Sequence, residues 1–337
     1  MSWDLIGHAW AIQLFRRHLA QGRTRQAYLI CGPDGVGKHT LATSLASGLS
    51  CLEPPEPGES CGKCRACRLI AAGTYPDLHQ IEADRVGGVL KVEQIRELQR
   101  QLALAPFEGR WRIALLLRFH EANASAANAL LKTLEEPASQ AILILTARAP
   151  EALLPTIVSR CELITLRPLP ADEIAEGLKA RGVEPDRAAL AAALAGGRPG
   201  KAIQLASDDR ALTRRTQLVS DLRSLLGASL IERFRYVEKL SRGGETGDRR
   251  EKGLEVLETW LALWRDVMYR SYGSGGASGT TEQDEIIEQI AGSLQPAQVL
   301  SAVEATERAL EGISQNANLR LAFEILMLDI PSVDSGK

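Results

Sequence analysis

The sequence predicts an α/β protein in which a parallel sheet is followed by two helical segments. Short apolar runs alternate with helix-type segments as far as about residue 165, which is typical of a parallel sheet covered by helices on both faces. Beyond that point the apolar residues recur at helical spacing. The length of 337 residues suits two or three domains. We expect an α/β domain over 1–166, a small helical domain over 167–207 and an all-α domain over 208–337.

Each predicted element rests on a local pattern. The predicted strands are the apolar runs at 27–31, 113–117 and 141–146, together with the shorter segment 78–81. The predicted helices of the first domain have their apolar residues on one face, at 6–22, 40–46, 89–104 and 124–136. Two prolines in Leu166–Pro170 predict a stiff linker, and a Gly- and Ser-rich stretch at 271–281 predicts a loop between helices.

Composition and charge exclude several classes of protein. Hydrophobic residues make up 45% and charged residues 24%, so the chain is globular rather than disordered. The net charge of −2 gives no whole-chain argument for nucleic-acid binding, although a local basic face stays open. We expect a cytoplasmic protein without membrane contact, because no apolar run approaches the roughly 18 residues of a membrane span and the first residues lack a signal-peptide pattern.

The segment Gly32–Lys38 has the spacing of a phosphate-binding P-loop between a predicted strand and a predicted helix. Its glycines let backbone N–H groups surround phosphates, and Lys38 would meet the β and γ oxygens. The hydroxyl that should follow the lysine and hold Mg²⁺ is replaced by His39, and Thr40 comes one position late, turned by about 100°. We expect a P-loop fold and leave open whether ATP or ADP binds. The candidate nucleotide-binding residues are Gly32, Gly35, Gly37, Lys38, His39 and Thr40.

The carboxylate that organises Mg²⁺ should follow a later strand, and the best candidate strand is 113–117. Leu117 and Arg118 stand where acidic residues are expected, and neither side chain can hold a metal ion. Glu121 is a possible substitute, but it lies beyond the end of the strand. The sequence therefore predicts a nucleotide site without its catalytic half.

Four of the six cysteines fall in one short window, with nine, two and two residues between successive members. Four thiolates at such spacing are enough for a closed tetrahedral zinc shell, and a shell without an open position is structural. An iron–sulfur cluster and unliganded thiols are the alternatives. The two remaining cysteines, Cys31 and Cys161, read as small buried residues. The candidate metal ligands are Cys51, Cys61, Cys64 and Cys67.

Four stretches together resemble the bacterial clamp-loader family of AAA+ proteins. They are the P-loop, the cysteine insert at 51–67, the segment Asn128–Pro137 and the triplet Ser159-Arg160-Cys161. The resemblance covers about residues 5–205 and implies a RecA-like AAA+ domain with a zinc-binding insert, a helical lid and a helical collar. These parts agree with the expected domains. It also implies a five-membered hetero-oligomeric ring with gamma/tau and delta subunits of DNA polymerase III.

Taken alone, Arg160 would be interpreted as one member of a surface ion pair. Within the triplet Ser159-Arg160-Cys161, the resemblance implies that Arg160 acts as an arginine finger on the ATP of a neighbouring subunit. It places Gly200 where an active subunit carries a phosphate-sensing arginine, with Arg198 a near miss. Together with the missing carboxylate, this implies a non-hydrolysing structural subunit of the polymerase holoenzyme that helps to load the sliding clamp on primed DNA.

Two other functions stay open from the sequence. One is an active gamma/tau-like clamp-loader ATPase with a non-standard metal site, which the leucine at position 117 disfavours. The other is a zinc-dependent DNA-binding module, which predicts a basic cysteine loop. The first half of that loop is acidic instead, with Glu53, Glu56 and Glu59.

Overall fold

The computed structural model describes residues 3–242, 246–273, 282–314 and 317–333. The chain divides into two units, Met1–Ser207 and Asp208–Lys337. Residues 274–281 of the predicted Gly- and Ser-rich loop lie outside the described residues.

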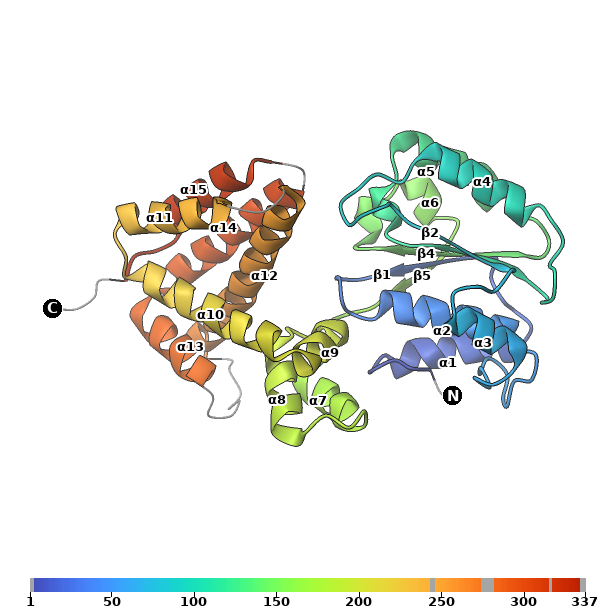
Figure 1. Ribbon diagram of the computed structural model, residues 1–337, viewed down its shortest axis with the longest axis horizontal. Coiled ribbons are helices and arrows are strands. Elements are labelled where there is room, and N and C mark those ends of the chain that lie inside the picture. Colours follow the sequence, from blue (N-terminus) through green and yellow to red (C-terminus); the bar gives the residue numbers. More distant parts are fainter. Residues whose placement is uncertain (1–2, 243–245, 274–281, 315–316, 334–337) are drawn as a thin grey trace. The chain divides into compact units, whose positions relative to one another are not determined.

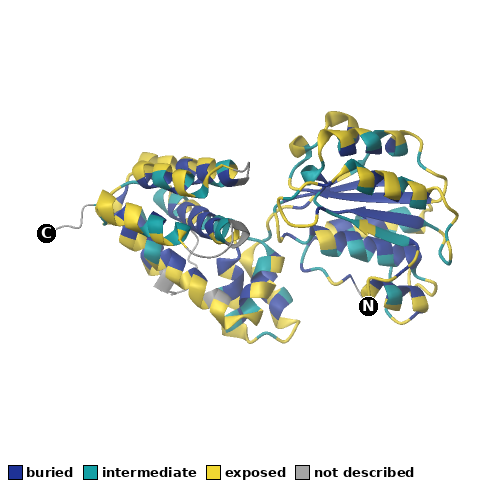
Figure 2. Cartoon of the chain, turned by 45° about the horizontal axis from the view of Figure 1, so that its top comes forward, coloured by how far each residue is buried: buried dark blue, intermediate teal, exposed yellow. Residues whose placement is uncertain are grey.

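The strands of the first unit form one parallel sheet (Figure 1). Its order is β2-β3-β4-β1-β5, and every pairing is parallel. The strands are β1 (Ala27–Cys31), β2 (Leu78–Ile81), β3 (Arg112–Leu116), β4 (Ala141–Ala147) and β5 (Glu162–Thr165). All residues of β1, β3 and β4 are buried, as their apolar runs predict for strands covered on both faces (Figure 2). The predicted parallel α/β sheet is confirmed.

Helices cover both faces of this sheet (Figure 1). Tyr28 and Ile30 of β1 belong to the core that includes α1 (Ala9–Ala20) and α2 (Lys38–Ser50). The alternate residues of β1 face the other core, because successive side chains of a strand point to opposite faces. That second core contains residues of α4 (Val92–Leu102), α5 (Ala124–Glu135) and α6 (Pro155–Val158).

Some element boundaries differ from the sequence predictions. The first helix begins at Ala9 rather than at residue 6, because His8 has a left-handed backbone with φ 56°. The imidazole of His8 is buried, with Nε2 3.1 Å from the carbonyl oxygen of Val36. The third strand runs over Arg112–Leu116, one residue earlier than predicted, although Leu117 is still buried.

A buried carboxylate fixes the loop that precedes β3. Asp77 is fully buried and accepts hydrogen bonds from the amides of Phe107 at 2.7 Å, Glu108 at 2.9 Å and Gly109 at 2.9 Å. Burial acts to raise the pKa of Asp77, but the three amide donors outweigh it and lower the pKa. The ionised carboxylate therefore stabilises the fold.

The remaining helices of the first unit are short. The cysteine segment leads into α3 (Arg65–Ala71), and after the sheet come α7 (Ala171–Lys179), α8 (Pro185–Leu194) and α9 (Pro199–Ser207). Two single 3₁₀ turns lie at Phe119–Glu121 and Pro150–Ala152. Ile174, Ala188 and Ala202 are fully buried, so the three later helices share apolar contacts.

In the second unit, all regular structure among the described residues is helical. Its core contains the fully buried Trp260, Trp264 and Phe323. The Nε1–H of Trp260 donates to the carbonyl oxygen of Leu218 at 2.8 Å, which satisfies the buried indole. Within the described part of the chain, no helix combines the length and apolarity that crossing a membrane requires. The helices are α10 (Asp209–Leu226), α11 (Leu230–Ser241), α12 (Thr246–Ser271), α13 (Glu282–Ser293), α14 (Pro296–Ser314) and α15 (Leu319–Asp329).

Candidate functional site

Four cysteine side chains come together in the segment that follows α2 in the sequence. Cys51 directly follows α2, Cys64 directly precedes α3 and Cys67 lies in the first turn of α3. Their Sγ atoms and that of Cys61 all lie within 4.8 Å of one another, and the Cys51 and Cys64 sulfurs are 4.0 Å apart. Sulfurs bound at about 2.3 Å to a tetrahedral Zn²⁺ stand about 3.8 Å apart. The cluster therefore has the donor set and nearly the spacing of a closed metal shell.

Backbone amides point at two of these sulfurs. The N–H of Cys61 donates to Cys51 Sγ at 3.3 Å, and the N–H of Cys64 donates to Cys61 Sγ at 3.2 Å. Hydrogen bonds from the amides of Lys63 and Cys64 lower the pKa of the Cys61 thiol to about 6. Burial raises the pKa of Cys67 to about 12. A bound dication would favour the thiolate at both positions, since metals bind the deprotonated form.

The cysteine segment packs closely on the sheet domain. A Cβ atom on Gly48 of α2 would lie 2.6 Å from the carbonyl oxygen of Gly58, so only glycine allows this approach. Glu59 forms an ion pair with Arg16 of α1. These contacts hold the segment that carries the thiols against α1 and α2.

The P-loop joins β1 to α2, and its lysine is turned inward. Lys38 Nζ donates to the carbonyl oxygens of Gly32 at 2.6 Å and Pro33 at 2.9 Å, and it lies 3.2 Å from Asp34 Oδ1. Burial lowers the pKa of Lys38, although Asp34 acts in the opposite direction. Arg148 Nε donates to the other oxygen of Asp34 at 2.9 Å. The ammonium group that would meet a phosphate is thus already satisfied by the chain itself.

Two other segments enclose the P-loop. The N–H of Gly200, in the first turn of α9, donates to the carbonyl oxygen of Gly35 at 2.8 Å. A Cβ on Gly200 would lie 3.0 Å from that oxygen, and Gly35 has φ +81°, which favours glycine. On another side, the buried His8 contacts Val36 as described above. The P-loop is therefore held between α9 and the residues that precede α1.

A leucine and an arginine occupy the position of the expected Mg²⁺-organising carboxylate. Leu117 is 6% exposed and packs in the core. Arg118 has a left-handed backbone with φ 47°, and its N–H donates to Thr146 Oγ1 at 2.9 Å. Its guanidinium donates to Glu121 at 3.0 Å and to Glu82 at 2.5 Å. Burial acts to lower the pKa of Arg118, but these two carboxylates raise it.

The other candidates for metal binding are engaged elsewhere. Glu121 also accepts a hydrogen bond from the amide of Gly87 at 2.8 Å, and its side chain is only 7% exposed. His39 is exposed, with Nε2 3.5 Å from Thr43 Oγ1 one turn further along α2. Among the described residues, the positions considered for Mg²⁺ therefore offer no carboxylate free of other partners.

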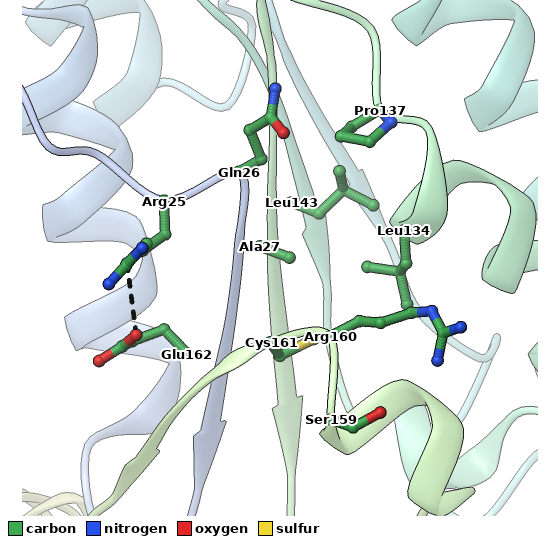
Figure 3. A pocket seen from close by; sticks show the side chains of 10 residues that line it. All are labelled: Arg25, Gln26, Ala27, Leu134, Pro137, Leu143, Ser159, Arg160, Cys161 and Glu162. Carbon is green, nitrogen blue, oxygen red and sulfur yellow. Dashed lines mark ion pairs between the residues drawn. The ribbon is translucent and has the colours of Figure 1, made fainter.

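Arg160 and the P-loop lie at opposite ends of the parallel strands. The P-loop follows the carboxyl end of β1, whereas Arg160 precedes the amino end of β5, which pairs in parallel with β1. A five-residue strand is about 15 Å long, so the two sites are separated by at least that length. A hollow of about 400 Å³ opens at the amino end of these strands (Figure 3), and Arg25 Nε lies 3.5 Å from Glu162 Oε2 beside it. Its lining includes Arg25, Gln26, Leu134, Leu143, Arg160 and Glu162.

Two acceptors hold the Arg160 guanidinium. Nη2 donates to Glu135 Oε1 at 2.6 Å, and Nη1 donates to the carbonyl oxygen of Thr156 at 2.8 Å. The Arg160 side chain is 34% exposed. Burial raises the pKa of the adjacent Cys161 thiol to about 12, so this side chain is neutral and anchors the loop as an apolar group.

The structure brings the four predicted metal ligands together and places the predicted nucleotide-binding residues in one loop and the start of α2. Whether they bind nucleotide stays a prediction. The partners in two ion pairs, Asp34 with Arg148 and Arg160 with Glu135, were not predicted, although an ion pair was the alternative interpretation of Arg160. Their members are 114 and 25 residues apart in the sequence, so no local pattern identifies them. The one available signal for Glu135 was its place in the motif Asn128–Pro137.

The sequence of this chain is similar to those of known proteins. Residues 7–170 match the family described as "DNA polymerase III, delta subunit". DNA polymerase III subunit delta' of Pseudomonas aeruginosa is 36% identical over 223 residues, which cover 65% of this chain and 67% of that protein. The Bacillus subtilis subunit delta' is 28% identical over 318 residues, or 94% of both chains. DNA polymerase III subunit tau of Escherichia coli is 36% identical over 176 residues, covering 52% of this chain and 27% of that protein.

The two delta' relatives differ from the tau relative in coverage. They match across two thirds or more of their own length, whereas the tau match is confined to about a quarter of that protein. The resemblance inferred from the motifs is confirmed, and this chain belongs to the family of DNA polymerase III delta' subunits.

Proposed function

We propose that this protein is a structural subunit of a DNA polymerase III clamp loader that does not itself hydrolyse ATP. In this proposal it assembles with gamma/tau and delta subunits in a five-membered cytoplasmic ring and helps to load the sliding clamp on primed DNA. Residues 167–207 would serve as the lid, and residues 208–337 as the collar that joins the ring. Membership of the delta' family supports this assignment.

The nucleotide site supports the absence of hydrolysis. Phosphoryl transfer depends almost entirely on positioning and on charge stabilisation, with Mg²⁺ held by a hydroxyl and a carboxylate. Here His39 replaces the hydroxyl residue, and Arg118 occupies a carboxylate position with its side chain bound to Glu82 and Glu121. Lys38 is occupied by the carbonyls of its own loop. Little remains to hold the metal ion or to orient a water molecule.

The position of Arg160 is the observation that carries the proposal of a role in trans. It stands at the amino edge of the sheet, away from the chain's own P-loop, and its guanidinium is partly exposed. A head-to-tail ring contact sets the nucleotide site of one subunit against a different face of the next. A guanidinium presented there can stabilise charge that develops on a γ-phosphoryl group, an effect worth on the order of 10³–10⁵ in rate for such residues.

We propose that the cysteine cluster holds one structural zinc ion. Four sulfur donors leave no open coordination position, so the metal would stabilise the segment 51–67 and take no part in catalysis. The contacts of this segment with α1 and α2 would then transmit that stability to the sheet domain.

The proposal is tested with a reconstituted clamp loader in which only this subunit carries Arg160→Ala. The complex should assemble normally, while ATP hydrolysis stimulated by DNA and clamp should fall. Arg160→Lys should restore little, because an ammonium group keeps the charge but loses the planar donor geometry. Unchanged hydrolysis and clamp loading in the Arg160→Ala complex would show that the role in trans is wrong.

A further inference from the structure

We propose that Glu135 is a positioning residue that orders Arg160 for the nucleotide of the neighbouring subunit. This inference rests on the proposed role of Arg160 in trans and assigns a function to a carboxylate at the end of α5. The two side chains are joined by a 2.6 Å contact between Arg160 Nη2 and Glu135 Oε1.

The place of Glu135 in its helix is unfavourable for the helix alone. Glu135 is the last residue of α5, where the partial negative charge of the helix carbonyls repels a carboxylate. An acid at such a position destabilises the helix end unless a cation compensates for it. The last turn of α5 also contains Lys132, but the cation that forms an ion pair with Glu135 is Arg160. The contact therefore explains a residue that helix stability does not.

The geometry leaves Arg160 able to act while it is held. A guanidinium has five N–H donors, and the contacts with Glu135 and Thr156 use one on each terminal nitrogen. Within the described residues, three donors therefore remain for phosphate oxygens. The Thr156 carbonyl belongs to the four-residue helix α6. Arg160 is thus fixed between the ends of two helices that pack on the sheet.

The pair contributes little to folding. The Arg160 and Glu135 side chains are 34% and 50% exposed, and ion pairs of this exposure contribute little to stability. The larger effect of the Glu135–Arg160 pair is to restrict the conformational freedom of the long Arg160 side chain. Immobilising such a side chain at an interface costs conformational entropy, and Glu135 removes part of that cost before the neighbour's nucleotide arrives.

The test uses the reconstituted clamp loader with variants of this subunit alone. Other ATPase subunits add a background, so each result is compared with the loss that Arg160→Ala causes. Glu135→Ala should lower the Arg160-dependent part of kcat roughly two- to fourfold, with little change in KM for ATP. Glu135→Gln should restore most of it, because the amide oxygen still accepts a hydrogen bond at the same reach.

Two controls separate positioning from a general structural effect. Glu136→Ala removes the neighbouring exposed carboxylate, and it should leave kcat unchanged. In a subunit that already carries Arg160→Ala, adding Glu135→Ala should cause no further loss, because Glu135 acts only through Arg160. In the isolated chain, the Nε–H order parameter of Arg160 measured by NMR relaxation should fall in Glu135→Ala and stay unchanged in Glu136→Ala.

The outcomes separate this inference from the proposed function. If Arg160→Ala leaves hydrolysis unchanged, the role in trans is wrong and the inference is wrong with it. If Arg160→Ala lowers hydrolysis but Glu135→Ala does not, only the inference is overturned. An equal further loss from Glu135→Ala in the Arg160→Ala background, or an unchanged Arg160 order parameter, also overturns it.

Discussion

Replacing Arg118 by aspartate restores a carboxylate at the position where an active nucleotide site needs one. The structure predicts that this change destabilises the protein and creates no ATPase activity. Arg118 is the counter-ion of Glu121 and Glu82, and its Nη2 also donates to the carbonyl oxygen of Ala83 at 3.1 Å. An aspartate would instead face two like charges. The left-handed backbone at this position is no obstacle, since aspartate adopts it more readily than arginine does.

The size of the effect follows from the exposure of the three charges. The Glu121 side chain is 7% exposed, so it would be left as a nearly buried carboxylate with one amide donor from Gly87. Breaking a buried ion pair in this way costs about 3–5 kcal/mol. Because the Arg118 side chain is 23% exposed, we expect about 3 kcal/mol for Arg118→Met. Repulsion in Arg118→Asp should add about 1 kcal/mol.

The measurement combines thermal unfolding with steady-state ATP hydrolysis. For a unit of this size, about 3 kcal/mol in Arg118→Met lowers Tm by roughly 6–12 °C, and about 4 kcal/mol in Arg118→Asp lowers it by roughly 8–16 °C. Arg118→Met is the matched control, because it keeps the aliphatic stem without adding a negative charge. An Arg118→Asp variant that melts with the wild type, or that gains Mg²⁺-dependent ATPase activity, would contradict this account of the site.

Three further predictions concern the metal cluster, the fold and the P-loop. Cys64→Ser should lose about one zinc ion per chain, measured by elemental analysis, and its free energy of unfolding should fall by several kcal/mol. Wild-type protein that melts at the same Tm with and without metal would exclude the zinc site. Because the folded-state pKa of Asp77 is lowered, its stabilisation is full above the unfolded value of about 3.9 and is lost as pH falls through the folded pKa. As pH falls below about 5, the free energy of unfolding measured with urea should therefore decrease more steeply for the wild type than for Asp77→Asn. The same pH dependence in both proteins would refute this. The isolated wild-type chain and its Lys38→Ala variant should both hydrolyse ATP only at background rate. ATP turnover by the wild-type chain that Lys38→Ala abolishes would show that the nucleotide site is active.

The sequence predicted four of the five strands in the described sheet, and three of these four are fully buried apolar runs. The strand β5 was missed, because only Ile164 among its four residues is buried and its apolar pattern is correspondingly weak. The strands at 27–31 and 78–81 have the predicted bounds. The starts of helices were less predictable. The first helix begins later than its apolar spacing indicates because His8 is held in a left-handed conformation by packing against the P-loop, which is a tertiary contact.

The candidate site was predictable where spacing alone determines proximity. Cysteines with only two residues between them lie close together in a turn, and the cluster of Cys61, Cys64 and Cys67 follows from that spacing. Cys51, at the end of α2, joins this cluster. The inward turn of Lys38 could not be predicted, because it depends on how the loop carbonyls fold around it. The ion pairs that link distant segments were equally inaccessible from local patterns.

The most direct test of the central claim compares two variants of this subunit in the same reconstituted clamp loader. Lys38→Ala changes the chain's own P-loop, and Arg160→Ala changes the opposite edge of the sheet. The measured quantity is ATP hydrolysis stimulated by clamp and primed DNA. We predict that Lys38→Ala leaves it nearly unchanged and that Arg160→Ala lowers it without loss of assembly. The reverse pattern, a loss with Lys38→Ala and none with Arg160→Ala, would contradict the account.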